Sequence, residues 1–179
     1  MALADVAAAA RAVLPASIED TMVAIGGAET GGAWDNPPSS VDVASDNPYT
    51  CPAYSIQPAP FSFGTWQVNL QANRSLIAPM AGVTTPCGIA DWIMASYVNA
   101  ARAALAVYRS QGYGAWTTYR DGRYLAYLPA ARAALGTAPT TSLVAVSPAV
   151  TTAPVSAAGA RMEGVLVFGL LGVLLLATL

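Results

Sequence analysis

Apolar positions in the first part of the chain recur with the spacing of helices. Residues 2–14 place apolar side chains on one face among alanines, which predicts an amphipathic helix that Pro15 ends. That face consists of Leu3, Val6, Ala10, Val13 and Leu14. A second, strongly apolar helix follows, with Ser17 as its expected N-cap, two acidic residues in its first turn and an end near Gly31.

The pattern changes after this second helix. Residues 33–61 contain six prolines and few periodic apolar positions, which predicts a long irregular loop, a feature that in compact domains is usually functional or mobile. A short strand or turn is predicted at 63–70. Helical spacing returns at 91–110, the longest predicted helix, which Gln111-Gly112 ends. It returns again at 124–135, where Gly136 ends the helix and Pro129 is an alternative start for its regular part.

The composition changes twice more towards the end of the chain. Residues 137–160 are rich in Thr, Pro, Ser, Ala and Val without a charge, which predicts a flexible linker. Residues 164–179 form a run of sixteen uncharged residues, and a helix that begins at Ala157 reaches the length of about 20 residues that a membrane span needs. Because the run has no polar face, a membrane helix is favoured over a helix buried in an oligomer or particle wall. We therefore predict a folded domain at 1–136, a linker, and a single C-terminal transmembrane helix at 161–179.

Charge and residue types exclude several classes of function. The net charge is −2, so no basic patch exists for a nucleic-acid backbone and no nucleic-acid partner is expected. The chain has no histidine, which excludes Ser-His-Asp triads and histidine metal sites; no metal or organic cofactor is expected. Cys51 and Cys87 are too few for a metal site, and the sequence leaves open whether they form one disulfide or stay free thiols. The carboxylates are therefore the leading acid–base candidates.

Glu29 stands out among these carboxylates. It follows the apolar segment Ile25-Gly26-Gly27-Ala28 at the expected end of the second helix. Glycoside cleavage needs a carboxylic acid that is protonated near neutral pH, and apolar surroundings raise the pKa of a carboxyl group. The polar and aromatic segment 62–69 could close over it as a turn. The two segments together predict a sugar-cleaving cleft, and the alternative is a solvated glutamate at a helix end.

The order of these motifs resembles the lysozyme-like superfamily, specifically soluble lytic transglycosylases and phage lysozyme-like domains. Members carry a Glu-Ser-Gly-Gly-like catalytic segment and a Gly-Leu-x-Gln-Ile-like turn. These resemble Glu29-Thr30-Gly31-Gly32 and Gly64-Thr65-Trp66-Gln67-Val68, and an Asn-Ala helix and a Gly-x-x-x-Trp segment follow. Residues 109–116 are also similar to the end of actinobacterial resuscitation-promoting factor domains, which share that fold. The resemblance covers residues 5–135, with Thr30 in place of the usual serine and a longer loop between the motifs.

The resemblance implies a mainly α, lysozyme-like domain and a role for each motif. Glu29 would protonate the glycosidic oxygen and then act as base on the 6-hydroxyl of muramic acid, which releases a 1,6-anhydro sugar. One carboxylate suffices for this reaction, because the substrate supplies the nucleophile. Ser62 and Gln67 would line the cleft near the acid, and Tyr119 would line it by analogy with a tyrosine of the family.

Three further residues are candidates for the site, each with a structural alternative. Trp66 and Trp116 are candidates for stacking on sugar rings, although buried tryptophans usually pack in the core. Asp35 is the candidate second carboxylate, which an inverting hydrolase would place roughly 6.5–9.5 Å from the acid. Its alternative role is to form a turn.

The expected function is that of a lytic transglycosylase that degrades peptidoglycan by cleaving the bond between N-acetylmuramic acid and N-acetylglucosamine. Its expected partners are the glycan strand, membrane lipid through the C-terminal helix, and other virion proteins. A tail anchor without a secretory signal indicates a virion-associated enzyme, in a virion membrane or the host cell envelope, that breaches the wall when a bacteriophage enters. The alternatives are a bacterial wall-remodelling enzyme, a true lysozyme, and a non-catalytic structural membrane or capsid protein with the same fold.

Overall fold

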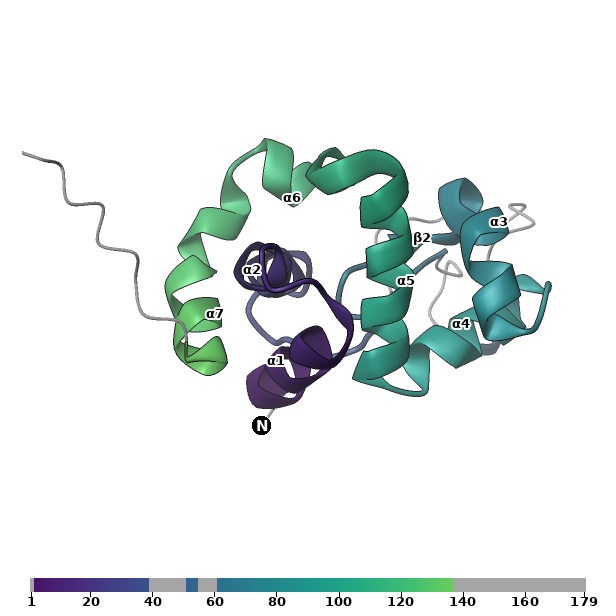
Figure 1. Cartoon of the computed structure of the whole chain (residues 1–179). Helices are drawn as coiled ribbons and strands as arrows, with labels where there is room; N and C mark the ends of the chain where they lie inside the picture. Colours follow the sequence, from purple (N-terminus) through teal and green to yellow (C-terminus); the bar gives the residue numbers. More distant parts are fainter. Residues whose placement is uncertain (1, 39–50, 55–60, 137–179) are drawn as a thin grey trace, which may run out of the picture. The chain divides into compact units, whose positions relative to one another are not determined.

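Helices form most of the computed structural model, which describes residues 2–38, 51–54 and 61–136 (Figure 1). The mainly α class is therefore confirmed. The helices are α1 (Ala2–Val13), α2 (Glu19–Glu29), α3 (Leu70–Ala81), α4 (Pro86–Met94), α5 (Tyr97–Gln111), α6 (Thr117–Arg120) and α7 (Leu128–Leu135). Three short 3-10 helices are η1 (Pro52–Tyr54), η2 (Gly112–Ala115) and η3 (Arg123–Ala126). Among the described residues no helix is long and apolar enough to cross a membrane; the predicted linker and transmembrane helix lie outside them.

Helix α2 occupies the centre of the domain, with α1, α6, η3 and α7 packed around it (Figure 1). Every residue from Met22 to Gly27 is buried. This follows from the sequence, because a helix that is apolar on all sides must be enclosed by other elements. The predicted N-cap is wrong: Ile18 holds the capping position without a side-chain hydrogen bond, so packing rather than a Ser17 cap fixes the start of α2.

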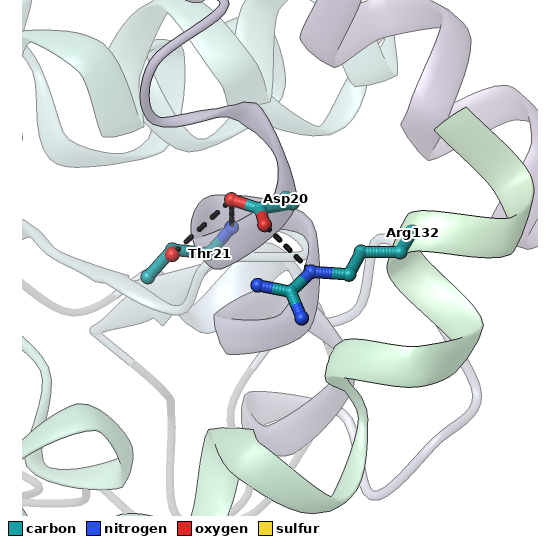
Figure 2. Close-up of polar contacts among 3 residues, drawn as sticks. All are labelled: Asp20, Thr21 and Arg132. Carbon is teal, nitrogen blue, oxygen red and sulfur yellow. Dashed lines mark hydrogen bonds and ion pairs between the residues drawn. The ribbon is translucent and has the colours of Figure 1, made fainter. Parts of the chain in front are cut away.

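The N-terminal turn of α2 is joined to α7 through Asp20 (Figure 2). Arg132 donates from Nε to Asp20 Oδ2 at 2.9 Å, and the backbone N–H of Thr21 donates to Asp20 Oδ1 at 2.7 Å. The two side chains of the ion pair are 35% and 28% exposed, so the pair contributes no more than about 1 kcal/mol. The pair links α7 to the first turn of the central helix.

Two glycines let other segments approach the C-terminal half of α2. A Cβ atom on Gly27 would lie 2.7 Å from the ring of Trp34, and one on Gly26 would lie 2.9 Å from Thr65 Cγ2. The loop after α2 and the turn between the two strands therefore both press against the helix backbone. Side chains at these positions would push both segments away from the end of the helix, where Glu29 lies.

A two-stranded antiparallel hairpin, β1 (Ser62–Phe63) and β2 (Val68–Asn69), carries the turn, which confirms the predicted short strand. Gly64 adopts the left-handed region with φ +78°, and Gln67 does so with φ +44°. The N–H of Gln67 donates to the Gly64 carbonyl at 2.8 Å and closes the turn. A positive φ is rare for a residue with a side chain, so the surrounding contacts must hold Gln67 in place.

Asn36 joins this turn to the rest of the domain. Its Oδ1 accepts from the Thr65 N–H at 2.9 Å, and its Nδ2 donates to the carbonyls of Ile93 and Met94 at 3.2 Å. Thr65, which is completely buried, also donates from Oγ1 to the Asp35 carbonyl at 2.6 Å. The start of the long loop is thus an ordered support under the turn.

One helix prediction needs correction, and one helix was missed. The single helix expected at 91–110 is divided into α4 and α5, because the Ser96 side chain accepts from the Asn99 N–H and caps a new helix. Helix α3 was not predicted. Asn69 caps it by accepting from Ala72 N, and Gly82 ends it with φ +69°. Few α3 residues are buried and Pro79 lies inside the helix, so its apolar periodicity is weak.

The cysteines, whose state the sequence left open, form a disulfide. Cys51 and Cys87 are bonded, with their Cα atoms 4.8 Å apart. The bond joins the long loop to the first turn of α4. Tyr54 makes a second link there, because its hydroxyl donates to Asp91 Oδ1 at 2.8 Å.

Candidate active site

A pocket of about 470 Å³ opens at the C-terminal end of α2. Three parts of the chain form its walls: the end of α2, the hairpin, and the segment from η2 to η3. The lining residues are Ala28, Glu29, Ser62, Gln67, Asn69, Ala115, Trp116, Thr117, Thr118 and Arg123. The fold therefore brings Glu29 into one pocket with Ser62 and Gln67.

Glu29 is the last residue of α2 and is half-buried. Its Oε1 accepts a hydrogen bond of 2.5 Å from Thr118 Oγ1, and Thr118 is only 2% exposed. This hydrogen bond fixes the orientation of the Glu29 carboxyl group at the pocket wall. No pattern in the sequence marks Thr118, apart from its position two residues after Trp116.

The chain turns away directly after Glu29 because of Thr30. The Thr30 hydroxyl donates to the Gly26 carbonyl at 2.8 Å and accepts from the Trp34 N–H at 2.9 Å. The N–H of Gly32 donates to the Gly27 carbonyl at 2.7 Å. These bonds end α2 and leave Glu29 at the pocket wall. The Thr30 hydroxyl makes both of the side-chain contacts in this turn.

Ser62 and Gln67 lie on the hairpin wall of the pocket. Ser62 is 1% exposed. Gln67 donates from Nε2 to the carbonyls of Pro37 and Gly64, at 3.0 and 2.9 Å. Because both partners can only accept, the amide has one orientation, with Oε1 left for other contacts. Their predicted role in binding substrate stays a prediction.

The two tryptophans that were candidates for sugar stacking lie in the core. Trp66 is completely buried and donates from Nε1 to the Met22 carbonyl at 2.7 Å. Trp116 is 4% exposed and donates from Nε1 to the Trp66 carbonyl at 2.7 Å. Trp116 forms part of the pocket wall, but neither ring presents a face on which a sugar could stack. Core packing, the alternative given by the sequence, therefore describes both.

Tyr119 and Asp35 do not line the pocket. Tyr119 is stacked between Tyr113 and Tyr124, with ring centroids 4.8 Å apart on each side. Asp35 is exposed, and its backbone carbonyl accepts a hydrogen bond from Thr65 Oγ1. Among the described residues, Glu29 is the one carboxylate in the pocket lining.

Arg123 is a residue of the pocket that sequence reasoning missed. Its side chain is 59% exposed and lies 3.7 Å from Asp121, a distance at which an exposed ion pair is weak. It therefore supplies a positive charge at the mouth of a pocket that also holds a carboxylate. The described part of the chain has no group of three or more His, Cys, Asp or Glu side chains that could hold a metal ion.

Comparisons with known proteins give no independent evidence of a family or a function. No family model matches the chain, and no curated protein and no solved structure matches it. The function must therefore be argued from the motifs and the pocket.

Proposed function

We propose that the protein is a peptidoglycan lytic transglycosylase that cleaves the bond between N-acetylmuramic acid and N-acetylglucosamine. One observation carries the proposal. The two segments that resemble the catalytic glutamate and the cleft turn of lysozyme-like enzymes are more than thirty residues apart, yet Glu29, Ser62 and Gln67 line the same pocket. A pocket of about 470 Å³ lies within the range of small-molecule sites.

The proposed reaction uses Glu29 twice. The protonated carboxyl gives its proton to the glycosidic oxygen, and the bond from that oxygen to C1 of the muramic acid breaks. The carboxylate then takes the proton of the 6-hydroxyl of the same sugar, and the oxygen at C6 bonds to C1. The products are a free sugar hydroxyl on one fragment and a 1,6-anhydro muramic acid on the other.

The presence of one carboxylate in the pocket lining, among the described residues, supports this reaction over hydrolysis. An inverting hydrolase needs a second carboxylate to activate water. Asp35, the candidate for that task, is exposed and does not line the pocket, and no other carboxylate of the described ranges does. When the 6-hydroxyl of the muramic acid is the nucleophile, no second carboxylate is needed.

The proposal extends to where the enzyme works. An uncharged run at 164–179 after an uncharged linker is typical of a tethered membrane protein. We propose a virion-associated enzyme that is held at the point where a bacteriophage breaches the wall. The competing interpretation is a structural membrane or capsid protein of a virion that has kept a lysozyme-like fold without activity.

The deciding experiment compares Glu29→Gln with Asp35→Asn, a matched change of the exposed carboxylate. Purified full-length proteins are incubated with peptidoglycan, and clearing and fragment masses are measured. We expect the wild type and Asp35→Asn to release 1,6-anhydro fragments, and Glu29→Gln to be at least about a hundredfold slower. Equal clearing by Glu29→Gln would refute the assignment of the acid. Reducing-end products would indicate a lysozyme, and no clearing by the wild type would favour the structural interpretation.

A further inference from the structure

Four tyrosine rings form a continuous column along the segment from α5 to η3. Tyr108, Tyr113, Tyr119 and Tyr124 follow one another, with ring centroids 4.8 Å apart at each step. They come from four successive elements, α5, η2, α6 and η3. The planes of Tyr113 and Tyr119 are inclined by 22°, and those of Tyr119 and Tyr124 by 25°, so both pairs are stacked nearly parallel. Stacked rings at this distance are in direct contact.

The column is the one place, among the described residues, where tyrosine rings stack on one another. Tyr54 packs against Phe63 and Tyr127 against Trp34, each with ring centroids 5.6 Å apart, and Tyr97 is stacked on no tyrosine of this part of the chain. Each ring of the column is half-buried, so it keeps some contact with solvent. The phenols are therefore close to one another and still within reach of a small oxidant.

Tyr113 has a hydrogen-bonded route for its proton. Its phenol is hydrogen-bonded to the Thr21 side chain, and the Thr21 hydroxyl donates to Asp20 Oδ1 at 3.3 Å. Figure 2 shows the far end of this route, where Arg132 Nε donates to the other carboxylate oxygen of Asp20 at 2.9 Å. A phenol that loses an electron must also release its proton. A carboxylate at the end of such a path takes that proton and so favours oxidation of this ring.

We infer that the column is a site of oxidative cross-linking, in which a dityrosine bond joins Tyr119 to Tyr113 or to Tyr124. The oxidant is hydrogen peroxide, used by a haem peroxidase. Each of two phenols loses one electron and one proton, and at Tyr113 the proton leaves through Thr21 to Asp20. The two radicals form a carbon–carbon bond between the ring positions next to their hydroxyl-bearing carbons, and the hydrogens of those positions move to the oxygens. Peroxide receives the two electrons and two protons and becomes two water molecules.

The bond fastens one wall of the pocket that contains Glu29. Both pairs include Tyr119 of α6, the helix whose Thr117 and Thr118 line that pocket. Arg123, which also lines it, lies between the two tyrosines of the second pair in the sequence. A cross-link therefore closes a short ring of chain within this wall. The contacts between the rings carry the inference, so it holds whether or not the protein cleaves peptidoglycan.

The test treats the purified full-length protein with a haem peroxidase and hydrogen peroxide, isolates the monomer by gel filtration and digests it with trypsin. Cleavage after arginine places Tyr113 and Tyr119 in one peptide, 110–120, and Tyr124 in another, 124–132. A bond between Tyr113 and Tyr119 lowers the mass of peptide 110–120 by two hydrogens. A bond between Tyr119 and Tyr124 joins the two peptides. Mass spectrometry thus distinguishes both products.

Three variants separate the column from its surroundings. Tyr119→Phe keeps the ring but removes its phenol, and we expect both products to be lost. Tyr127→Phe is the matched control, because Tyr127 shares a peptide with Tyr124 but packs on a tryptophan, and it should give the wild-type yield. Thr21→Val removes the hydroxyl on the proton route and should lower the yield of the product between Tyr113 and Tyr119 severalfold. Thr21→Ser should restore that yield.

Oxidised wild type that yields neither product would overturn the inference, and this result needs no variant to fold. Cross-links confined to dimers, or joined peptides that contain Tyr127 in place of Tyr124, would overturn it as well, because tyrosines outside the column would then be the reactive ones. Equal yields from Thr21→Val and the wild type would refute the route through Asp20. If both products form and the wild type cuts no peptidoglycan, the cross-linking site stands and the proposed enzymatic function fails.

Discussion

Thr118 and Glu29 are 89 residues apart in the sequence, yet their side chains are joined by a hydrogen bond of 2.5 Å. Thr118 is buried, so this hydroxyl has little access to water as an alternative partner. A hydrogen bond to an ionised group contributes about 1.5–3 kcal/mol. Thr118 is therefore expected to position the acid without touching the reacting atoms.

Thr118→Val, which keeps the shape of the side chain and removes the hydroxyl, should lower the cleavage rate by about tenfold or more. The measurement is kcat and KM for the release of the anhydro sugar. A positioning role lowers kcat and leaves KM nearly unchanged. Thr118→Ser should restore kcat, and an unchanged kcat with a lower melting temperature would show a purely structural role.

Tyr113 makes the stability of the domain depend on pH in the alkaline range. Burial, and to a smaller extent the neighbouring Tyr108, raises the pKa of the Tyr113 phenol from 10.0 to about 12. Below pH 10 the phenol is neutral in both the folded and unfolded states. Between pH 10 and 12 only the unfolded state loses the proton, so the free energy of unfolding falls as pH rises.

Urea unfolding of the wild type and of Tyr113→Phe, compared below pH 10 and near pH 11, measures this contribution. The phenylalanine variant should lose less stability over the same interval, because it has no proton to release at this position. Parallel pH dependence of the two proteins would contradict the assignment. Tyr54, whose pKa is also raised to about 12 by burial and by its bond to Asp91, should keep part of the slope in both.

The sequence was sufficient to predict some residues of the pocket and not others. Glu29, Ser62 and Gln67 lie in short segments with distinctive neighbours, and the fold places them together. Thr118 and Arg123 are ordinary residue types in a surface-like segment, and only the path of the chain after Trp116 brings them to Glu29. Trp66 shows the reverse case, because an aromatic residue in a motif does not reveal whether its ring faces a ligand or the core.

Helix α2 depends on its glycines for its tight packing. Although glycine is a poor helix former, an alanine at position 27 would put its Cβ 2.7 Å from the Trp34 ring. Trp34 also donates from Nε1 to the Val23 carbonyl at 3.2 Å, so displacing the ring would break this bond as well. The glycine therefore sets the distance between α2 and the loop that follows Glu29.

Gly27→Ala should lower the free energy of unfolding by about 1–3 kcal/mol through overpacking, despite the higher helix propensity of alanine. Gly114→Ala is the control, because no atom lies within 4 Å of its added Cβ and its backbone has no positive φ. That change should stay within about 0.5 kcal/mol. Urea unfolding checks both, and equal stabilities of the two variants would contradict the packing argument.

At the level of elements, the sequence predicted those whose formation depends on apolar periodicity or a breaking residue. The ends at Gly112 and Gly136 are examples, both with positive φ. It failed where a polar side chain decides the boundary. The Ser96 cap divides α4 from α5, and the Asn69 cap starts α3, yet serine and asparagine occur equally well inside loops.

The Cys51–Cys87 bond constrains the whole domain, because it closes a loop of 36 residues that includes the hairpin. A cross-link of this span stabilises a protein by about 2–4 kcal/mol, mainly by restricting the unfolded chain.

The double variant Cys51→Ala and Cys87→Ala should unfold at lower urea concentration, with a loss of about 2–4 kcal/mol. Reduction of the wild type by dithiothreitol should give nearly the same loss. The reductant should have no effect on the double variant, which serves as the control. A wild type that is insensitive to the reductant while its thiols react would show that the bond does not stabilise the domain.

The two indoles described above connect all three walls of the pocket in series, from α2 through the hairpin to the segment that carries Thr118. Neither ring N–H can exchange with heavy water unless those walls separate. Slow deuterium uptake at both indoles, at the rate of global opening, would mean that the cleft stays assembled between turnovers. Such a protein would bind the proposed glycan strand in a rigid cleft that is already formed before the strand arrives.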